Sequence, residues 1–162
     1  MCADFTKVEN NLLEDEGGIA QVTGDAGGLT KYGISQRSYP LLDIRNLTVQ
    51  KAESIYKSDW WDANSLDEIN SQDIANKIFL GMINLGVTVT IKASQRALCA
   101  VGSTVAVDGD FGPETRAAVN DASQGWLLDR LRVELALVYT NIVENKSMDL
   151  KFLEGWLFRA LQ

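Results

Sequence analysis

The sequence predicts a mainly α-helical fold with one small, glycine-rich β-like excursion near the N-terminus. Through most of the chain, apolar residues recur at the spacings of three and four that are typical of helices with one buried face. Glycines gather between residues 17 and 33 at intervals too short for a helix. The chain has 162 residues, of which 46% are hydrophobic, so it can bury a core without a metal or a disulfide.

The first predicted helix covers about residues 4–16. Its apolar stripe consists of Phe5, Val8, Leu12 and Leu13. Gly17 and Gly18 end it, since glycine is costly within a helix and favoured directly after one. Glu16 is therefore expected at the carboxyl end of an amphipathic helix. Residues 19–34 are expected to be irregular or to form a hairpin.

Two further helices are predicted in the middle of the chain. Thr48 is a good N-cap for the first, which extends to about Trp61. Its apolar face consists of Val49, Ala52, Ile55, Tyr56 and Trp60. After a polar connection over residues 62–70, Ser71 caps a strongly apolar helix that ends near Leu85. This second helix is the best candidate for the central buried helix of the fold.

The rest of the chain is also predicted to be helical. Gly86 interrupts the apolar helix, and helical spacing resumes over residues 90–101. Residues 106–113 form a loop, and Pro113 suits the first position of the helix that follows. Two final helices are predicted over about residues 123–145 and 149–161.

The ionisable residues exclude several classes of function. The chain contains no histidine, which removes Ser-His-Asp and Cys-His nucleophiles and the commonest metal ligand. The formal net charge of −7 disfavours nucleic-acid binding, because phosphate neutralisation needs clustered Lys and Arg. Cys2 and Cys99 lack metal-ligand spacing and are interpreted as reduced thiols rather than as a disulfide. We expect neither a metal nor another cofactor.

No segment has the pattern of a targeting or membrane sequence. Residues 1–10 contain no apolar run, so no signal peptide is expected. No stretch approaches the roughly 20 apolar residues that a membrane span needs. We expect a monomer that is made in the cytoplasm.

Two carboxyls and a hydroxyl lie where acid–base chemistry could use them. Glu16, at a helix end against apolar neighbours, has a placement that raises the pKa of an acid. Asp25 lies in the glycine-rich excursion, which can fold back beside that helix end, and Thr30 offers a hydroxyl that can hold a water molecule against Asp25. Taken alone, Glu16 and Asp25 are equally well explained as ordinary surface and turn residues. Only the whole arrangement is specific.

The arrangement as a whole matches a known pattern. Its most specific part is Glu16-Gly17-Gly18 followed by Gly24-Asp25-Ala26-Gly27-Gly28-Leu29-Thr30-Lys31-Tyr32-Gly33-Ile34-Ser35. The further matching steps are Tyr39-Pro40, Asp43-Ile44, Leu47-Thr48, Ile55-Tyr56, Trp61-Asp62, and Asn84 with Gly86. Together they resemble glycoside hydrolase family 108, which comprises bacterial and phage N-acetylmuramidases with a lysozyme-like fold. Ala26 stands where the family has a proline.

The resemblance implies an activity and a set of site residues. It implies hydrolysis of the β-1,4 bond between N-acetylmuramic acid and N-acetylglucosamine in peptidoglycan glycan strands, with Glu16 as the acid. Similarity to phage-type lysozymes implies that Asp25 and Thr30 position the attacking water. Substrate contacts are expected at Tyr32, Trp61 and Asn84. For Trp61, a place in the core remains the better interpretation of an aromatic residue at a helix end.

A second motif lies in the other half of the chain. It consists of Gln95-Arg96-Ala97-Leu98 and Val107-Asp108-Gly109-Asp110-Phe111-Gly112-Pro113-Glu114-Thr115. It resembles the signature of predicted peptidoglycan-binding helical modules, although packing explains it as well as binding does, with a turn, a core phenylalanine and a helix start. We therefore expect a muramidase catalytic region over residues 1–90 and a helical predicted peptidoglycan-binding region over 91–162, packed together as one globular unit.

Three alternatives to a muramidase stay open. A lytic transglycosylase would use Glu16 alone, without a water molecule. A non-catalytic wall-binding or secretion-accessory module would bind the wall without cleaving it, and a helical interaction protein would have no connection with the wall. Without a signal peptide, the muramidase would reach the wall in the periplasm as an endolysin released by a phage or through a dedicated export system.

Overall fold

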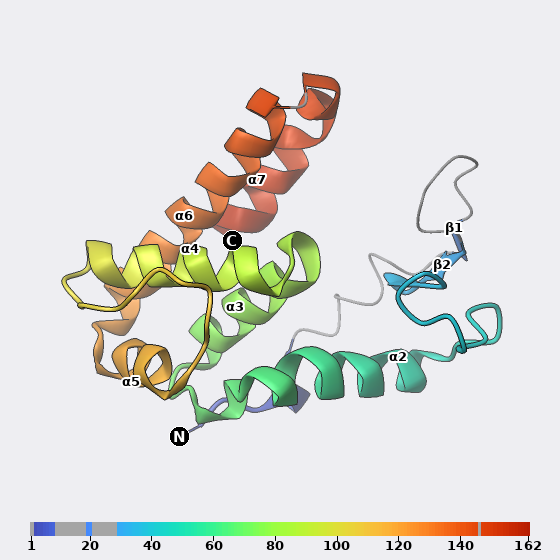
Figure 1. Ribbon diagram of the computed structural model, residues 1–162, viewed down its shortest axis with the longest axis horizontal. Coiled ribbons are helices and arrows are strands. Elements are labelled where there is room, and N and C mark those ends of the chain that lie inside the picture. Colours follow the sequence, from blue (N-terminus) through green and yellow to red (C-terminus); the bar gives the residue numbers. More distant parts are fainter. Residues whose placement is uncertain (1, 9–18, 21–28, 146) are drawn as a thin grey trace. The chain divides into compact units, whose positions relative to one another are not determined.

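The computed structural model describes residues 2–8, 19–20, 29–145 and 147–162, and it confirms a mainly α-helical fold (Figure 1). The chain divides into two units. One consists of residues 4–63, and the other of residues 1–3 together with 64–162.

The 4–63 unit begins with a short turn rather than a regular helix. Residues Phe5–Lys7 form the 3-10 helix η1, and Val8 is already extended, with φ −63° and ψ 126°. The Asp4 carboxylate accepts hydrogen bonds from the Thr6 backbone nitrogen (3.0 Å) and hydroxyl (2.8 Å), which closes the turn. The prediction of an α-helix from residue 4 is therefore wrong over residues 4–8, and its remainder, 9–16, lies outside the described residues.

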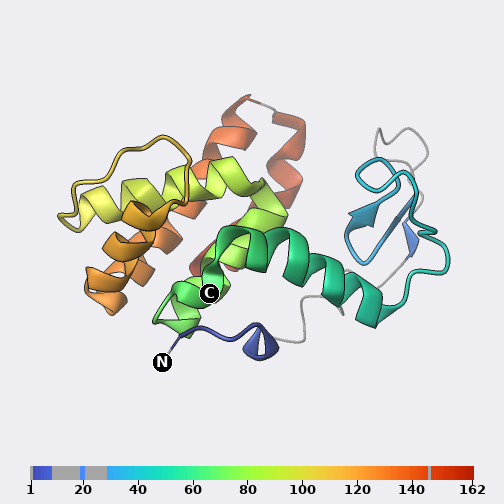
Figure 2. The same ribbon diagram turned by 60° about the horizontal axis from the view of Figure 1, so that its bottom comes forward.

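A small antiparallel sheet follows (Figure 2). Its strands are β1 (Ile19–Ala20), β2 (Thr30–Lys31) and β3 (Ile34–Ser35), with β2 in the middle. The register pairs Ala20 with Thr30 and Thr30 with Ser35. The predicted hairpin in the glycine-rich stretch is thus confirmed for its described residues.

Helix α2 (Val49–Tyr56) begins where the sequence predicts. The Thr48 side chain accepts a hydrogen bond from the Lys51 backbone nitrogen, as an N-cap does. The helix continues as the π-helical turn η2 (Lys57–Trp61) and the 3-10 turn η3 (Asp62–Asn64). Its buried residues are Ala52, Ile55, Tyr56 and Trp61.

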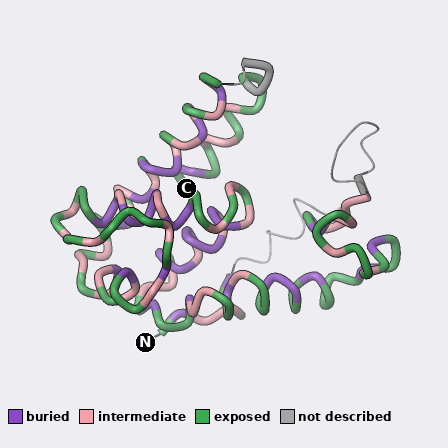
Figure 3. The backbone as a smooth tube through the Cα atoms, viewed as in Figure 1, coloured by how far each residue is buried: buried purple, intermediate pink, exposed green. Residues whose placement is uncertain are grey.

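The core of the other unit forms around helix α3 (Gln72–Leu85), whose N-cap is Ser71. Figure 3 shows its buried residues in purple; the apolar ones are Ile74, Ala75, Ile78, Phe79 and Met82. This confirms the predicted central helix. The preceding segment was expected to be a polar connection, but Leu66 in η4 (Leu66–Glu68) and Ile69 are fully buried.

Five more helical segments complete this unit. Helix α4 (Val87–Ala100) begins directly after Gly86, and α5 (Pro113–Asp121) has Pro113 at its first turn. The long helix α6 (Gln124–Asn145) is followed by η5 (Ser147–Phe152) and α7 (Leu153–Leu161). Helices α4, α5 and α6 lie within three residues of the predicted positions. The last helix, predicted from residue 149, starts at Leu153, because η5 occupies the residues before it.

Helix α7 is held against α3 and α6 by an aromatic stack and two cations. The ring centroids of Tyr139 and Trp156 are 5.5 Å apart. Lys77 Nζ on α3 donates to the Arg159 carbonyl (2.8 Å), and Arg132 on α6 donates to the carbonyl of Gln162 (2.6 Å). Cations at a helix carboxyl end are favourable, because they satisfy its last carbonyl groups.

The structure also describes the two cysteines and bears on membrane spans. Cys2 and Cys99 are exposed free thiols. Among the described residues, no helix is both long enough and apolar enough to cross a membrane.

Candidate active site

The predicted site residues fall in three places. Glu16 and Asp25 lie outside the described residues. Thr30 and Tyr32 lie together in the β2–β3 hairpin of the 4–63 unit, and Trp61 ends η2 of the same unit. Asn84 lies in the last turn of α3, in the other unit.

The hairpin that carries Thr30 turns through two residues. Tyr32 has φ +51° and Gly33 has φ +71°, and β2 pairs with β3 through Lys31 and Ile34 on either side. Positive φ at both central residues is the mark of a type I′ turn, whose twist matches that of the flanking strands. Glycine adopts this conformation freely, but a residue with a side chain does so only where the surroundings hold it there.

Neighbouring side chains hold Tyr32 in this conformation. The Tyr56 hydroxyl, on α2, donates to the Tyr32 carbonyl at 2.9 Å. Tyr56 itself is 2% exposed, and the bond is partly buried. Lys31 Nζ lies 5.3 Å from the centroid of the Tyr32 ring and donates to the Arg45 carbonyl (3.1 Å).

The loop after β3 is fixed by one amide side chain. Nε2 of Gln36 donates to the carbonyls of Tyr39 (3.1 Å), Pro40 (3.0 Å) and Leu42 (2.9 Å). The Gln36 backbone nitrogen donates to the Leu29 carbonyl (2.8 Å), directly before Thr30. The loop and the hairpin therefore share one hydrogen-bonded framework.

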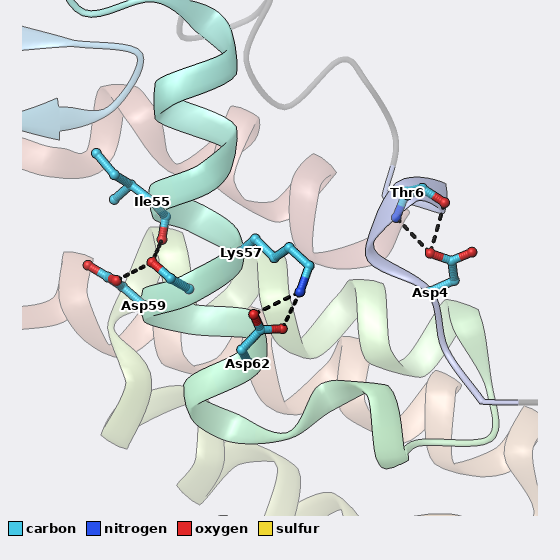
Figure 4. Close-up of polar contacts among 7 residues, drawn as sticks. Asp4, Thr6, Ile55, Lys57, Asp59 and Asp62 are labelled. Atoms are coloured by element: carbon cyan, nitrogen blue, oxygen red, sulfur yellow. Dashed lines mark hydrogen bonds and ion pairs between the residues drawn. The ribbon is translucent and has the colours of Figure 1, made fainter.

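A short polar chain joins this loop to η2. The Tyr39 hydroxyl donates to Asp59 Oδ2 (2.5 Å). The Ser58 hydroxyl contacts Asp59 Oδ1 (2.5 Å) and the Ile55 carbonyl (3.2 Å), and Figure 4 labels Ile55 and Asp59. The hydrogen bonds from Ser58 and Tyr39 lower the pKa of Asp59. Burial, followed by the bond to Asp59, raises the pKa of Tyr39. Asp59 is thus an ionised acceptor at neutral pH and not a proton donor.

Trp61 is buried and Asn84 is exposed. Trp61 exposes 1% of its surface, and its ring lies edge-on to Phe5, with centroids 5.6 Å apart. In the same turn, Lys57 and Asp62 form an ion pair at 2.6 Å (Figure 4). The burial of Trp61 favours its place in the core over stacking on a sugar. Nδ2 of Asn84 donates to the Leu80 carbonyl of its own helix (2.9 Å).

The second sequence motif is folded around Gln95, which is 1% exposed. Its Nε2 donates to Asp108 Oδ1 (2.7 Å) and to the Asp110 carbonyl (3.0 Å), and its Oε1 accepts from the Gly109 backbone nitrogen (2.9 Å). Asp108 Oδ1 also accepts from the Asp110 backbone nitrogen (2.8 Å), and these bonds lower the pKa of Asp108. Thr115 Oγ1 donates to the same Asp110 carbonyl (3.1 Å).

Sequence reasoning missed two roles in these frameworks. The sequence pattern identifies Gln95 only as a motif residue, and it predicts Tyr56 only as a core residue. In both cases the decisive feature is a polar atom on a buried side chain, and a buried polar atom needs a partner. That rule points to a hydrogen bond at each position but does not identify the partner.

Comparison with known families finds two matches along the chain. Residues 10–86 match the profile of the family described as Glycosyl hydrolase 108, and residues 89–161 match that of the Predicted Peptidoglycan domain. Residues 10–86 form a glycosyl hydrolase family 108 region. This region ends with α3, and the predicted peptidoglycan domain begins inside α4.

The fold agrees with a solved structure as well. The structure of Brucella abortus SagA superposes with a TM-score of 0.77 at 24% sequence identity, over 96% of this chain and 88% of that one. At this identity the likeness shows the fold. A comparison with curated proteins found no match.

The family fixes the class of activity. A family 108 glycosidase region joined to a peptidoglycan domain makes the protein a peptidoglycan hydrolase that acts on the cell wall. The sequence prediction of a glycosidase with peptidoglycan as its substrate is confirmed at this level. Among the described residues, no cluster of Cys, Asp and Glu side chains is suited to hold a metal ion.

Proposed function

We propose that this family 108 enzyme is an N-acetylmuramidase, which hydrolyses the β-1,4 bond between N-acetylmuramic acid and N-acetylglucosamine. Glu16 is the general acid, and Asp25 and Thr30 hold the attacking water. The match of residues 10–86 to Glycosyl hydrolase 108 carries the proposal, because that region contains all three residues. Thr30 lies in β2, the middle strand of the small sheet, and the β2–β3 turn is held by a neighbouring side chain, which suits a residue that must fix a water molecule.

The proposed chemistry needs one protonated and one ionised carboxyl. Glu16 gives its proton to the oxygen of the leaving sugar as the glycosidic bond breaks. The water oxygen bonds to the anomeric carbon, and its proton passes to Asp25. The Thr30 hydroxyl accepts or donates one hydrogen bond that orients this water.

Two further parts of the proposal concern substrate contacts and organisation. Tyr32, half-buried at the hairpin turn, is the described aromatic residue best placed to meet the glycan beside Thr30. Trp61 and Asn84 are weaker candidates, given the burial of one and the bond of the other to its own helix. We also propose a catalytic region over residues 1–90 and a wall-binding region over 91–162.

The proposal is tested by lysis of outer-membrane-permeabilised Gram-negative cells. Wild type is expected to reduce the turbidity, and Glu16→Gln to lose nearly all of this activity while keeping its far-UV circular dichroism. Glu53→Gln makes the same change at an exposed position on α2 and should be fully active. A fully active Glu16→Gln would refute the assignment of the acid.

The mass of the soluble fragments separates the remaining alternatives. Reducing muramic ends support hydrolysis. Anhydro-muramic ends would instead show a lytic transglycosylase that uses Glu16 without water. Binding to sacculi with no loss of turbidity, by a folded wild type, would point to a non-catalytic wall-binding or secretion-accessory role.

A further inference from the structure

We infer that Tyr56 is a positioning residue for catalysis: its hydroxyl fixes the turn of the hairpin that holds Thr30. The inference rests on the proposed function, because it assumes that Thr30 orients the attacking water. It assigns a role in the reaction to a buried tyrosine on α2 that is not itself expected to touch the substrate.

The conformation of the turn is unfavourable for Tyr32. Tyr32 has φ +51°, a left-handed conformation that residues with a Cβ atom avoid. It occupies the first central position of the turn, where Asn, Asp and Gly are the usual residues. Its own preference therefore opposes the turn, and some other interaction must compensate.

The hydroxyl of Tyr56 provides the compensating interaction. The Tyr56 hydroxyl donates to the Tyr32 carbonyl at 2.9 Å, which orients the peptide group between Tyr32 and Gly33. Tyr56 is 2% exposed and packs on Trp60, with ring centroids 5.2 Å apart. Since its ring is held on α2, the hydroxyl is a fixed point against which the turn is set.

The strands of the hairpin are too short to fix its geometry by themselves. Strands β2 and β3 are two residues long, and Thr30 lies only two residues before Tyr32. A hairpin this short is barely stable by its own backbone bonds, so tertiary anchors decide its geometry. The Lys31 bond to the Arg45 carbonyl is exposed, whereas the Tyr56 bond is partly buried and is the stronger anchor.

Through the turn, a side chain on α2 sets the position of Thr30, the residue that orients the reacting water. A displacement of a catalytic group by about 1 Å can reduce a rate about a hundredfold. Loss of the Tyr56 bond would let the turn relax toward conformations that Tyr32 prefers, and it would move the Thr30 hydroxyl without altering the acid. The bond should therefore matter for turnover and much less for binding.

Two matched variants test the inference. Tyr56→Phe removes the bond to the hairpin, and Tyr139→Phe removes the hydroxyl of a buried tyrosine on α6, in the other unit. We expect Tyr56→Phe to lower kcat on soluble glycan fragments at least about fivefold, the factor that one ordinary hydrogen bond is worth, with little change in KM. Tyr139→Phe should stay within about twofold of wild type.

A double-mutant cycle with Thr30→Ala distinguishes positioning from general stability. If Tyr56 acts through Thr30, Tyr56→Phe should add little to the effect of Thr30→Ala. Full multiplication of the two effects, or unchanged kcat in Tyr56→Phe, would overturn the inference. A fully active Thr30→Ala would overturn it too.

A measurement that does not need activity covers the case in which Thr30→Ala is inactive. Backbone amide exchange at Gln36, whose nitrogen donates across the hairpin to the Leu29 carbonyl, should be faster in Tyr56→Phe than in Tyr139→Phe, and equal rates would overturn the inference. The Glu16→Gln result is independent of these arms. If Glu16→Gln is inactive while Tyr56→Phe behaves as wild type, only the positioning role fails and the muramidase assignment stands.

Discussion

Replacement of Gln95 by methionine would show whether the motif in the second half of the chain is a scaffold. Methionine has nearly the same length and volume, so packing is kept while all polar contacts of the side chain are lost. Gln95 makes four such contacts, three through Nε2 and one through Oε1. We expect Gln95→Met to destabilise the protein and to loosen the loop over residues 107–112.

The magnitude follows from the partners of these four bonds. An ordinary hydrogen bond contributes about 0.5–1.5 kcal/mol net, and the bond to the Asp108 carboxylate lies at the upper end of this range or above it. Asp108 and Asp110 are exposed, so water can replace part of what is lost. We therefore expect a loss of about 2–3 kcal/mol, which for a protein of this size lowers Tm by about 5–10 °C.

Thermal unfolding followed by circular dichroism measures this loss. Gln50→Met is the matched control, because Gln50 is exposed on α2 and should tolerate the change within about 1 °C. A Gln95→Met protein with the Tm of the control would refute the scaffold interpretation. The fall in pKa of Asp108 adds a pH test: stability from its carboxylate is present above about pH 4 and is lost below it, and this acid-side loss should be smaller in Gln95→Met.

Two further predictions concern helix packing in the same unit. A Cβ atom on Gly81 would lie 2.7 Å from Thr90 Cγ2, so Gly81→Ala should cost about 1–3 kcal/mol in urea unfolding, and Thr90→Ser, which removes that methyl group, should restore part of it. Burial, with a smaller effect of Arg132, lowers the pKa of Lys77 to about 8. Between pH 8 and about 10.5 the unfolded chain therefore binds a proton that the folded protein lacks, so the free energy of unfolding should rise with pH there. Urea unfolding at about pH 7.5 and pH 9.5 should show this rise in wild type and a smaller one in Lys77→Met, and an equal rise in both would contradict it.

The helices were predictable because their signals are local. Thr48 and Ser71 cap the helices that the sequence assigns to them, and Pro113 begins α5. Each of these signals acts on the backbone of the next few residues, so no knowledge of the rest of the fold is needed. The central position of α3 was also predictable, because a helix that is apolar over most of its surface must be buried.

The start of the chain shows where local patterning fails. Phe5 and Val8 have the spacing of a helical stripe, yet residues 5–7 form only a 3-10 turn. The Asp4 carboxylate accepts from the Thr6 backbone nitrogen as an N-cap does, so it favours the start of a helix. The chain is nevertheless extended at Val8, and neither the cap nor the spacing of apolar residues predicts an end after one turn.

The polar frameworks were out of reach for a related reason. Gln95 and Asp108 are separated by a helix end and a loop, and Tyr56 is 24 residues from Tyr32. A sequence shows that a buried polar atom will need a partner, but the partner is decided by how the segments pack. The candidate catalytic residues Glu16 and Asp25 therefore rest on the family motif, whereas the environment of Thr30 and Tyr32 rests on contacts that only the fold provides.

The two frameworks allow wall cleavage and wall binding to be tested apart. The Tyr56 bond and the Gln95 network lie in different units and share no residue, so changes in one are expected to leave the other intact. If Tyr56→Phe slows turnover while binding to sacculi is unchanged, the hairpin serves the reaction. If Gln95→Met weakens binding in proportion to its loss of stability, the motif contributes to the wall-binding region through its fold. Weakened binding at a temperature where Gln95→Met is fully folded would instead assign a direct contact with the glycan to the loop that Gln95 supports.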